Sequence, residues 1–398
     1  MIKKDDNRQE INDEETGIYI HIPFCRRKCI YCDFYSGGGK GVDWEQFTSC
    51  LLNELEQRKR ELRRKPSTLY IGGGTPSLMP LDSFSRLIKG IEEKTGKSDK
   101  WDEFTLEVNP EDVSEENCRE WKRCGVNRIS MGVQTLNDDE LKKIGRNHDS
   151  ATALKALDLL SSYFDNYTVD LIFGLPGQTL GSLTESVEKI IAKKPSHISA
   201  YSLMFEEGTA LTLLREQGRM EFPSEEECLE MWRFLQDILI KEGYEQYEIS
   251  NYALPGRESK HNRRYWLGNA YLGLGPSAHS YDGRNVRKGN RNDIKGYMNH
   301  FSGCGISVSP NREDEFYNEE ILTEEELAEE KIMLSMRMKR GLDTESFLKR
   351  FGEEAYARLM KNSGKMLKKE LIKERDGFIV LSKEGMMIAD EVILALCM

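Results

Sequence analysis

Residues 17–34 read GIYIHIPFCRRKCIYCDF, an apolar run followed by Cys25, Cys29 and Cys32 at the spacing C-x3-C-x2-C. Three thiolates gathered within eight residues are expected to converge on one inorganic centre. They are too few to close a tetrahedral zinc site, and neither a cysteine pair nor a histidine pair follows at zinc-finger spacing. A cubane iron–sulfur cluster held by three cysteines keeps one iron open for an outside ligand. The alternatives are a zinc site that borrows a distant ligand, and three unrelated buried thiols.

Around this stretch, short β-rich runs alternate with helical patterns as far as residue 203. The expected strands cover residues 18–22, 68–71, 104–108, 128–133, 168–173 and 198–203. The expected helices cover residues 43–63, 82–93, 114–124, 150–163 and 180–193. Six strand–helix units of this kind predict an α/β fold with a parallel sheet. Six units are fewer than the eight of a closed barrel.

Polar or glycine-rich motifs follow the ends of successive expected strands. Residues 72–76 read GGGTP after the second strand, Glu107 lies near the end of the third, and Gln134 follows the fourth. Arg146 comes next, and the fifth strand ends as DLIFGLPG, beginning at Asp170. In parallel α/β folds the carboxyl ends of the strands meet at one edge, where ligands bind. Each motif alone also fits a turn or a surface charge, but their order along one chain predicts a shared site.

The cysteine spacing and the strand-end motifs together resemble the radical S-adenosylmethionine (SAM) superfamily. The resemblance implies a six-unit partial (β/α)6 TIM-like barrel, with a 4Fe-4S cluster on the three cysteines and SAM chelating the fourth iron. It narrows to the coproporphyrinogen III oxidase-like branch and covers nearly the whole chain. By analogy, Glu107 would hold the ribose, the glycine run would pair with the methionine amine, and Tyr31 would approach the adenine. The residues that match the SAM contacts of this branch are Tyr19, Tyr31, Gly73, Gly74, Thr75, Glu107, Gln134, Arg146 and Asp170.

A second motif lies at residues 261–266, which read HNRRYW. His261 offers an axial ligand to haem iron, and Tyr265 and Trp266 offer flat apolar surfaces to a porphyrin. Nine Lys or Arg and three Asp or Glu between residues 256 and 295 give a local charge balance of +6. The candidates to meet haem propionates are Arg257, Lys260, Arg263 and Arg264. A core histidine with two buried aromatic neighbours is the alternative.

The H-N-x-x-Y-W pattern of His261, Asn262, Tyr265 and Trp266 also resembles the HemW family of haem chaperones within this branch. The sister family, oxygen-independent coproporphyrinogen III oxidase, usually has a fourth cysteine where this chain has Phe34, and a longer N-terminal segment. The resemblance implies a chaperone that binds a 4Fe-4S cluster, SAM and haem and transfers haem to an acceptor protein. The enzymatic alternative is oxidative decarboxylation of coproporphyrinogen III in porphyrin biosynthesis. No catalytic residue is assigned, and the pattern leaves open whether SAM is cleaved.

The composition of the chain limits the classes of binding partner that we expect. The formal net charge of −11 argues against a nucleic-acid backbone or an anionic membrane as the main partner. The polar start of the chain lacks the apolar run of a signal peptide, and nine cysteines, three of them clustered, fit a reducing compartment. We therefore expect a cytoplasmic protein whose partners are haem or a related tetrapyrrole and a haem acceptor. Dimerisation and a weak association with a membrane protein are left open.

The patterns also predict how the chain divides. The expected parts are a flexible tail over 1–16, the radical SAM partial barrel over 17–205, a barrel extension with the HNxxYW segment over 206–305, and a small winged-helix-like domain over 306–398. Within the last part, residues 323–326 read TEEE, as in a helix capping box. The acidic approach to this domain favours a lid or a partner surface over DNA binding.

Overall fold

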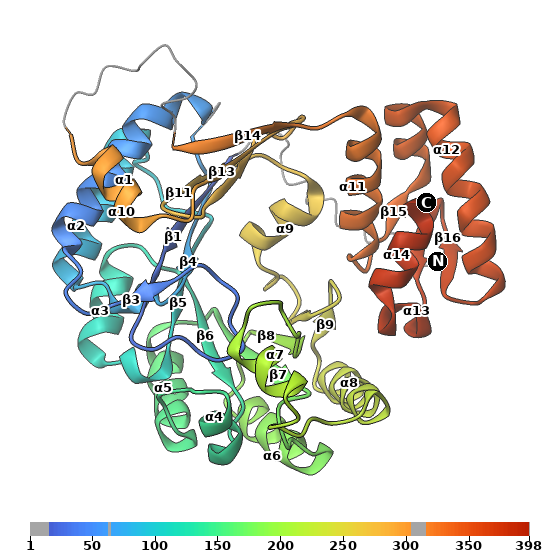
Figure 1. The fold of residues 1–398 in the computed structure, drawn as a ribbon, viewed down its shortest axis with the longest axis horizontal. Helices are drawn as coiled ribbons and strands as arrows, with labels where there is room; N and C mark the ends of the chain where they lie inside the picture. Colours follow the sequence, from blue (N-terminus) through green and yellow to red (C-terminus); the bar gives the residue numbers. More distant parts are fainter. Residues whose placement is uncertain (1–15, 63–64, 304–315, 398) are drawn as a thin grey trace, which may run out of the picture.

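The computed structural model describes residues 16–62, 65–303 and 316–397. The expected tail, apart from Thr16, and Cys304 lie outside these residues. The described chain forms a curved 12-stranded sheet in the order β14-β13-β12-β11-β1-β4-β5-β6-β7-β8-β10-β9 (Figure 1). Its parallel strands are β1 (Gly17–Ile22), β4 (Thr68–Gly73), β5 (Glu103–Val108), β6 (Arg128–Gln134), β7 (Tyr167–Phe173), β8 (His197–Ser202) and β11 (Tyr271–Leu274). The predicted α/β fold and its six strands are confirmed, with ends that differ by one or two residues.

Helices join the parallel strands as the sequence predicts. They are α1 (Trp44–Arg58), α2 (Leu81–Thr95), α3 (Glu115–Arg123), the short α4 (Asp138–Lys143), α5 (Ser150–Tyr163) and α6 (Leu180–Ile191). Helices α1, α3 and α5 begin after an N-cap residue. The side chains of Asp43, Ser114 and Asp149 accept hydrogen bonds from backbone N–H groups of the first turn. The predicted end of the first helix falls at residue 63, outside the described residues. The short elements between these helices and strands are β2 (Phe24–Cys25), β3 (Gly37–Gly38), η1 (Lys59–Glu61), η2 (Pro76–Leu78) and η3 (Pro110–Asp112).

Each parallel strand has one apolar and one polar face. In β1, Ile18, Ile20 and Ile22 are buried in the main hydrophobic core with residues of the surrounding helices. In β6, Arg128 and Ser130 alternate with apolar residues that belong to the same core. Because successive side chains of a strand point to opposite faces, the alternation turns a row of polar groups toward the inside of the curve. The interior of the partial barrel is therefore polar and suited to a charged ligand.

The sheet continues beyond the parallel strands on both sides, which the sequence analysis did not predict. Beside β11 lie the antiparallel strands β12 (His279–Tyr281), β13 (Val286–Asn290) and β14 (Tyr317–Ile321), called here the sheet extension. At the opposite edge β8 pairs with β10 (Asn251–Ala253), which pairs with β9 (Glu245–Gln246). The sequences VRKGN and YNEEI carry too few apolar residues to be recognised as strands.

A buried carboxylate fastens the sheet extension to the barrel. Glu54 of α1 is fully buried, and each of its two carboxylate oxygens accepts two hydrogen bonds. The donors are Arg58 Nη1 at 2.9 Å, Asn290 Nδ2 at 2.7 Å, Gly275 N at 2.8 Å and Tyr297 Oη at 2.6 Å. They come from α1, β13, the residue after β11, and α10 (Ile294–Phe301). One side chain therefore ties four separate segments together.

The segment after β8 is mainly helical. It contains α7 (Ala210–Glu216), α8 (Glu225–Lys241) and α9 (Lys260–Leu267). Helix α8 packs against α6, whereas α9 contacts β4 on one side and the C-terminal domain on the other (Figure 1). The HNxxYW motif therefore lies on a helix enclosed between the sheet and the last domain.

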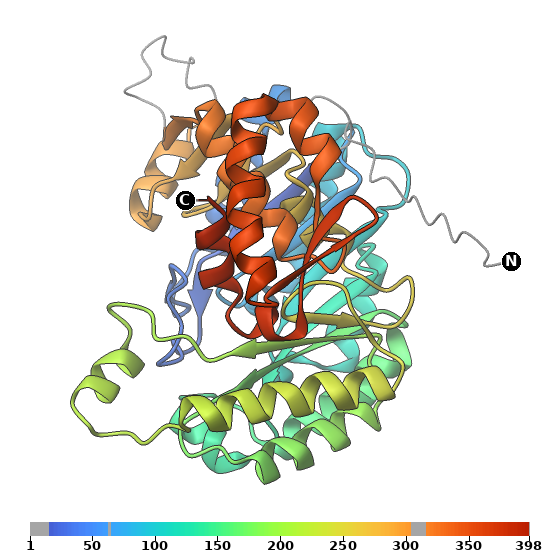
Figure 2. The same cartoon turned by 90° about the vertical axis from the view of Figure 1, so that its right-hand side faces the viewer.

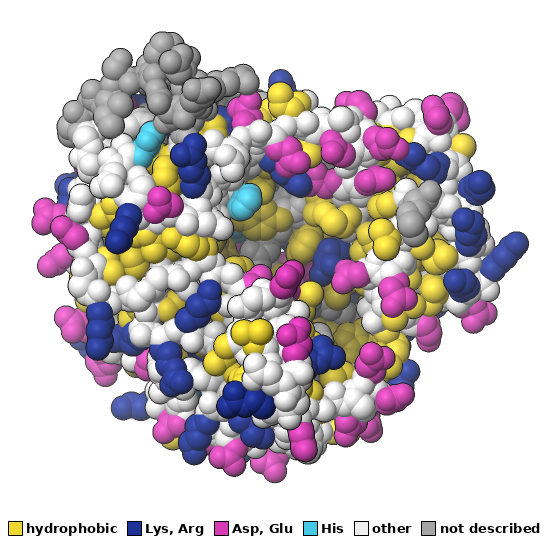
Figure 3. Space-filling model, in the orientation of Figure 1, with side chains coloured by type: hydrophobic (Ala, Val, Ile, Leu, Met, Phe, Trp, Pro, Cys, Tyr) yellow, Lys and Arg dark blue, Asp and Glu magenta, His cyan; other side chains and the backbone are white. Residues whose placement is uncertain are grey.

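The C-terminal domain, drawn in red in Figure 2, is small, and its buried apolar residues form a hydrophobic core of their own. Its elements are α11 (Glu324–Met336), β15 (Leu342–Asp343), α12 (Thr344–Lys368), β16 (Ile372–Arg375), β17 (Phe378–Leu381), α13 (Lys383–Met387) and α14 (Ala389–Cys397). The predicted capping box of Thr323 and Glu326 is confirmed. Between this domain and the barrel the surface is hollowed and carries hydrophobic side chains (Figure 3). Over the described residues, none of the helices combines the length and the apolar character that crossing a bilayer requires.

Candidate cofactor-binding site

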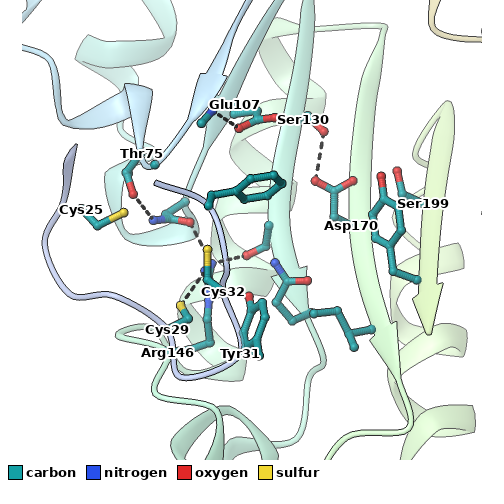
Figure 4. A pocket seen from close by; sticks show the side chains of 18 of the residues that line it. Cys25, Cys29, Tyr31, Cys32, Thr75, Glu107, Ser130, Arg146, Asp170 and Ser199 are labelled. Atoms are coloured by element: carbon teal, nitrogen blue, oxygen red, sulfur yellow. Dashed lines mark hydrogen bonds between the residues drawn. The ribbon is translucent and has the colours of Figure 1, made fainter. Parts of the chain in front are cut away.

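A cavity of about 440 Å³ opens where the parallel strands end (Figure 4). It unites the three cysteines with most of the residues predicted to contact SAM. The predicted residues on its wall are Cys25, Cys29, Tyr31, Cys32, Gly73, Gly74, Thr75, Glu107, Gln134, Arg146 and Asp170. Tyr19 is described but does not line the cavity. Residues up to 145 positions apart in the sequence therefore share one site, with cysteine sulfurs on one side and carboxylates on the other.

The three cysteines lie on the segment that follows β1, with Cys25 as the last residue of β2 and Cys29 and Cys32 on the loop after it; this segment is called here the cysteine loop. Backbone hydrogen bonds shape this loop, since Gly39 N donates to Cys25 O at 2.9 Å and Cys32 N donates to Cys29 O at 3.2 Å. All three thiols are partly exposed. Burial, with a contribution from the thiols of Cys29 and Cys25, raises the pKa of Cys32 to about 11. Binding to a metal centre would overcome this shift, because ligation deprotonates a thiol.

The donor set of the loop fits an iron–sulfur cluster. Among the described residues, no three His, Cys, Asp or Glu side chains converge closely enough to hold a single metal ion. The fit rests instead on three thiols facing one cavity, and on a cation beside them. Arg146 Nη1 donates to Cys29 Sγ at 3.6 Å, and a neighbouring cation favours the thiolate form that a metal needs.

Arg146 also connects the cysteine loop to the strands. Its Nη2 donates to Asn109 Oδ1 at 2.8 Å and to Gly132 O at 2.5 Å. Its Nε is buried and has no hydrogen-bond partner in the described part of the chain. Since buried donors are nearly always paired, an acceptor on a ligand in the cavity would satisfy this group.

The glycine run after β4 brings bare backbone to the cavity. Gly73 has φ 111°, a conformation that L side chains rarely adopt. A Cβ on Gly74 would lie 2.8 Å from Phe24 O and 2.9 Å from Ile22 O, which are backbone atoms that cannot easily move aside. Both positions therefore require glycine, and the turn presents peptide groups rather than side chains to a ligand.

Glu107 is the buried acid at the end of β5. Its Oε1 accepts a hydrogen bond from Tyr70 Oη at 2.7 Å, and its Oε2 accepts one from Gly73 N at 3.0 Å. Burial raises the pKa of Glu107 to about 7, and the nearby charge of Asp170 contributes to the rise. The two donors hold the carboxylate in place and leave lone pairs on both oxygens for ligand hydroxyl groups.

The raised pKa of Glu107 predicts a pH dependence of stability. In the unfolded chain a glutamate titrates near about 4.3, so between about pH 4.3 and 7 the folded protein binds more protons than the unfolded one. The contribution of Glu107 to the free energy of unfolding therefore decreases as the pH rises through that window. We expect Glu107→Gln to remove this loss, so that the variant gains about 3 kcal/mol relative to the wild type between pH 5 and pH 8. Urea unfolding of SAM-free protein at pH 5 and pH 8 measures the free energies of unfolding. If the variant and the wild type differ by the same amount at both pH values, the prediction is wrong.

Asp170 and Gln134 complete the far wall. Asp170 Oδ2 accepts a hydrogen bond from Ser130 Oγ at 3.0 Å, and burial raises its pKa. Gln134 has φ 67°, and the register between β6 and β7 shifts between Gly132 and Gln134. A non-glycine residue held in this region marks local strain, which proteins often keep at ligand sites. The bulge turns the Gln134 side chain toward the cavity wall.

Several residues of this wall were not predicted from the sequence. They include Tyr70, Ser130, Ser199 and Tyr201, which line the cavity from β4, β6 and β8. Side chains two positions apart in a strand share a face, so counting back by two from the polar residue at each strand end would have identified the other residues of the polar face. Tyr19, which was predicted, instead shares a hydrogen bond of 3.0 Å with His21 Nδ1. A contact between Tyr19 and SAM stays a prediction.

His261 of the HNxxYW motif lies in the interior of the protein. It is fully buried, and burial lowers its pKa to about 3. Its Nδ1 is hydrogen-bonded to Thr68 Oγ1 at 2.9 Å and its Nε2 to Tyr265 Oη at 2.9 Å. For His261 to bind haem iron, one of these hydrogen bonds must break and α9 must move. Haem ligation by this residue stays a prediction.

Glu103 anchors α9 to the barrel. Its Oε1 accepts hydrogen bonds from Ser259 Oγ at 3.1 Å and from His261 N at 2.9 Å, while its Oε2 accepts from Lys260 N at 2.7 Å. A carboxylate at the start of a helix satisfies N–H groups that lack partners within the helix and complements the helix dipole. The start of the HNxxYW helix is thus pinned to β5.

The other residues of the motif have different surroundings. Asn262 lines the cavity, whereas the guanidinium of Arg337, just after α11, lies 5.3 Å from the ring centroid of Trp266. Trp266 Nε1 is buried and has no hydrogen-bond partner among the described residues. Arg264 is buried and donates to Thr68 Oγ1 at 3.1 Å, so it is not available to a propionate.

Comparison with known sequences gives two family matches. The family described as the radical SAM superfamily matches residues 19–190, and the HemN C-terminal domain matches residues 322–388. The heme chaperone HemW of Bacillus subtilis is 35% identical over 380 residues, which cover 94% of this chain and 97% of that protein. The heme chaperone HemW of Lactococcus lactis subsp. lactis is 37% identical over 84% of this chain and 85% of its own length.

Comparison with solved structures supports the fold. Coproporphyrinogen III oxidase HemN from Escherichia coli, a radical SAM enzyme, superposes with a TM-score of 0.81. The match covers 96% of this chain and 90% of the other, at 21% sequence identity. At this identity the likeness establishes the shared architecture of a large mixed sheet with a small C-terminal domain.

Proposed function

Because the chain belongs to the HemW family of radical SAM proteins, we propose that it is a cytoplasmic haem chaperone that binds a 4Fe-4S cluster, SAM and haem, and transfers haem to an acceptor protein. The observation that carries the proposal is the shared cavity, in which the three cysteines face the residues matched to SAM contacts. Membership of the superfamily implies the cluster and SAM. Haem and its transfer are proposed from the two HemW relatives, which are heme chaperones.

Within the cavity, each group has a distinct role in the proposal. Cys25, Cys29 and Cys32 would hold the cluster, which when bound supplies an open iron for SAM and a route for electrons. Glu107 would accept hydrogen bonds from the ribose hydroxyls. Arg146 fixes the cysteine loop against β6 and keeps one N–H group for a ligand.

The glycine run and the aromatic residues would complete the SAM site. The peptide groups of Gly73 and Gly74 lie at the cavity wall, where they can meet the polar end of methionine. Tyr31 lines the same cavity from the cysteine loop and would offer its ring to the adenine. Together these groups would orient SAM between the cysteine loop and the carboxylates.

Coproporphyrinogen III oxidation is the second function to test. At the cavity mouth Phe34 is 61% exposed and stands where the oxidase family has a further cysteine. The likeness to HemN itself is one of fold. These two points favour the chaperone over the decarboxylase.

The test uses the full chain, reconstituted anaerobically with iron and sulfide. We expect haem titration to give a Soret band that saturates at one haem per chain, and loaded protein to deliver that haem to an apo-haem protein. In parallel, the protein is incubated anaerobically with coproporphyrinogen III, SAM and a reductant. A decarboxylated product would contradict the chaperone proposal and support the oxidase, and so would failure to bind haem. Gel filtration during the same preparation reports whether the protein dimerises.

A further inference from the structure

Large apolar side chains are exposed at the mouth of the cavity that contains the three cysteines. Phe34, two residues after Cys32, is 61% exposed, and Met204, which follows β8, is 62% exposed. Both line the cavity, as does Tyr201 near the end of β8, which is also exposed. They are three of the nine large hydrophobic residues that are exposed in the described part of the chain. Since an exposed apolar patch commonly marks a binding surface, the mouth of this cavity is suited to a large apolar ligand.

Two segments from distant strands meet at this mouth. In the sheet, β1 and β8 are separated by the four strands β4, β5, β6 and β7. The segments that follow them nevertheless touch, because Leu211 N of α7 donates to Ile30 O of the cysteine loop at 2.9 Å. Leu211 and Leu203 belong to a small hydrophobic cluster on which Ile30 packs. The exposed side chains of Phe34 and Met204 therefore lie next to a packed apolar layer, not on isolated loops.

A cation lies beside the apolar side chains. Lys28 Nζ donates to Phe34 O at 3.0 Å and forms no ion pair with any described residue, so the ammonium keeps N–H groups for a ligand. Arg27, its neighbour in sequence, is also exposed and lines the cavity. The wall contains the acidic residues Asp33 and Glu206 as well. The carboxylates of a ligand are therefore expected on the side of Lys28 and Arg27.

The cavity wall offers few groups that can bind haem iron, which proteins ligate through His, Cys, Met or Tyr. Among the described residues that line the cavity none is a histidine, and the three cysteines are matched to the cluster. Tyr31 is matched to the adenine, and Tyr70 donates its hydroxyl group to Glu107. Desolvation of its hydroxyl group raises the pKa of Tyr201, which opposes the phenolate form that binds iron. The thioether of Met204 remains, and it needs no loss of a proton to bind a metal.

We propose that haem binds across the mouth of this cavity, with its macrocycle against Phe34 and Tyr201 and with the Met204 sulfur as the ligand to its iron. The propionates lie beside Lys28. This inference rests on the proposed haem-binding function and assigns a place to it. Protein covers one face of the macrocycle and the other face stays open, which suits a carrier that must release haem to an acceptor.

Haem at the mouth leaves the inner part of the cavity to SAM. Glu107 and Asp170 belong to β5 and β7, and burial raises the pKa of both carboxyl groups. Phe34 and Met204 instead lie on segments that follow the strands and are exposed. The two ligands would therefore lie one behind the other, with SAM inside and haem outside.

The HNxxYW helix has a supporting part in this arrangement. His261 is enclosed, and both of its ring nitrogens are hydrogen-bonded, so α9 would have to move before this residue could bind iron. Asn262 lines the same cavity. The motif therefore forms part of the wall of the proposed site, and the exposed thioether of Met204 supplies the ligand.

Met204→Leu tests the iron ligand, since leucine keeps an apolar side chain of similar size and removes the sulfur. The full chain, reconstituted anaerobically, is titrated with haem and separately with metal-free protoporphyrin IX, and absorption and electron spin resonance spectra are recorded. We expect the variant to bind haem at least about tenfold more weakly, because even groups that only support a metal ligand contribute that much. The spectral signature of a thioether ligand should disappear, and binding of protoporphyrin IX should be unchanged. Met204→His should restore ligation, with the spectrum of a histidine ligand.

Two further variants serve as comparisons. Met333→Leu changes an exposed methionine of α11 outside the cavity, and its haem spectrum should equal that of the wild type. His261→Ala should keep the wild-type ligand signature in the fraction that remains folded. If Met204→Leu binds haem as the wild type does, or if the signature is lost in His261→Ala instead, the proposed site is wrong while the chaperone function stands. Equal weakening of haem and protoporphyrin IX by Met204→Leu would contradict iron ligation. If the wild type binds no haem, both proposals fail.

Phe34→Ser tests the contact with the macrocycle. It should weaken binding of haem and of protoporphyrin IX alike, by about tenfold, because it removes apolar surface that the ligand would cover. The iron and sulfide content of the variant should equal that of the wild type, which shows that the cysteine loop is intact. Unchanged binding of both ligands would place the macrocycle elsewhere.

Lys28→Glu tests the propionate end. The variant should bind haem about tenfold more weakly and bind haem dimethyl ester as the wild type does, because the ester has no carboxylates to meet the lysine. An equal effect on both ligands would place the propionates elsewhere. Lys40→Glu changes the charge of an exposed lysine nearby in sequence but outside the cavity wall, and it is the matched control.

Discussion

Cys29→Ala is expected to abolish the iron–sulfur cluster. After anaerobic reconstitution the wild type should carry about four iron and four sulfide per chain, and the variant less than about one tenth of this. Cys29 faces the cavity, its sulfur accepts from Arg146 Nη1, and its carbonyl oxygen accepts from Cys32 N. The alanine keeps the backbone contacts and removes only the ligand. Iron and acid-labile sulfide assays, with the absorption near the sulfur-to-iron charge-transfer band, measure the loss.

Cys124→Ala is the matched control. Cys124 is also partly exposed, but it lies at the end of α3 beside Ser85 and Glu120 and does not line the cavity. Its replacement should leave the iron and sulfide content at the wild-type level. A full cluster in Cys29→Ala, or an equal loss in both variants, would show that the cysteine loop does not hold the cluster.

Glu54→Ala is expected to destabilise the whole protein. The substitution leaves the guanidinium of Arg58, which is 5% exposed, without its buried partner, and it strips acceptors from Asn290, Gly275 and Tyr297. Arg58 keeps its second carboxylate, since its Nε lies 3.1 Å from Glu61 Oε1, so the cost comes mainly from the three buried donors left without this acceptor, at about 1–3 kcal/mol each. Urea unfolding should show a correspondingly lower midpoint, and limited proteolysis should cut first in the sheet extension.

Glu56→Ala is its control on the same helix. Glu56 is 46% exposed and is ion-paired with Lys59 and Lys94 at the surface. Exposed ion pairs contribute little, so the free energy of unfolding should change by less than about 1 kcal/mol. Equal destabilisation by the two variants would mean that the buried contacts of Glu54 are not the source of the effect, because alanine itself favours the helix.

The parallel strands could be predicted because their environment is uniform. Strand β1 is preceded by polar residues, is followed by Pro23 and carries three isoleucines at alternate positions, so its extent was clear from residues 18–22. The sheet extension could not be predicted in the same way. In β13 the side chains of Lys288 and Asn290 are held by Glu61 and Glu54, contacts that only the folded chain creates.

Site residues that belong to a sequence motif could be predicted, whereas residues that reach the cavity only through the folding of their strand could not. The cysteines and Glu107 were found from the sequence, and the cavity contains them. Ser130 and Ser199 were not found, because a serine within a strand carries no signal until its face is known. His261 illustrates the opposite case, since its motif points to function while its surroundings are those of a core residue.

The contacts of Glu103 with the start of α9 have a consequence for how the chain folds during synthesis. Glu103 must wait for residues 259–261 before its carboxylate is satisfied, and β1 must wait for β11 before its second edge is covered. At about 5–20 residues per second, the ribosome needs roughly 8–30 s to make the stretch between Glu103 and residues 259–261. Until then the nascent barrel exposes an unpaired strand edge and an unfilled polar floor. The segment matched to the radical SAM superfamily therefore lacks two of its stabilising partners while it is being made, and its open strand edge is covered only after residue 274, in the last third of the chain, has been synthesised.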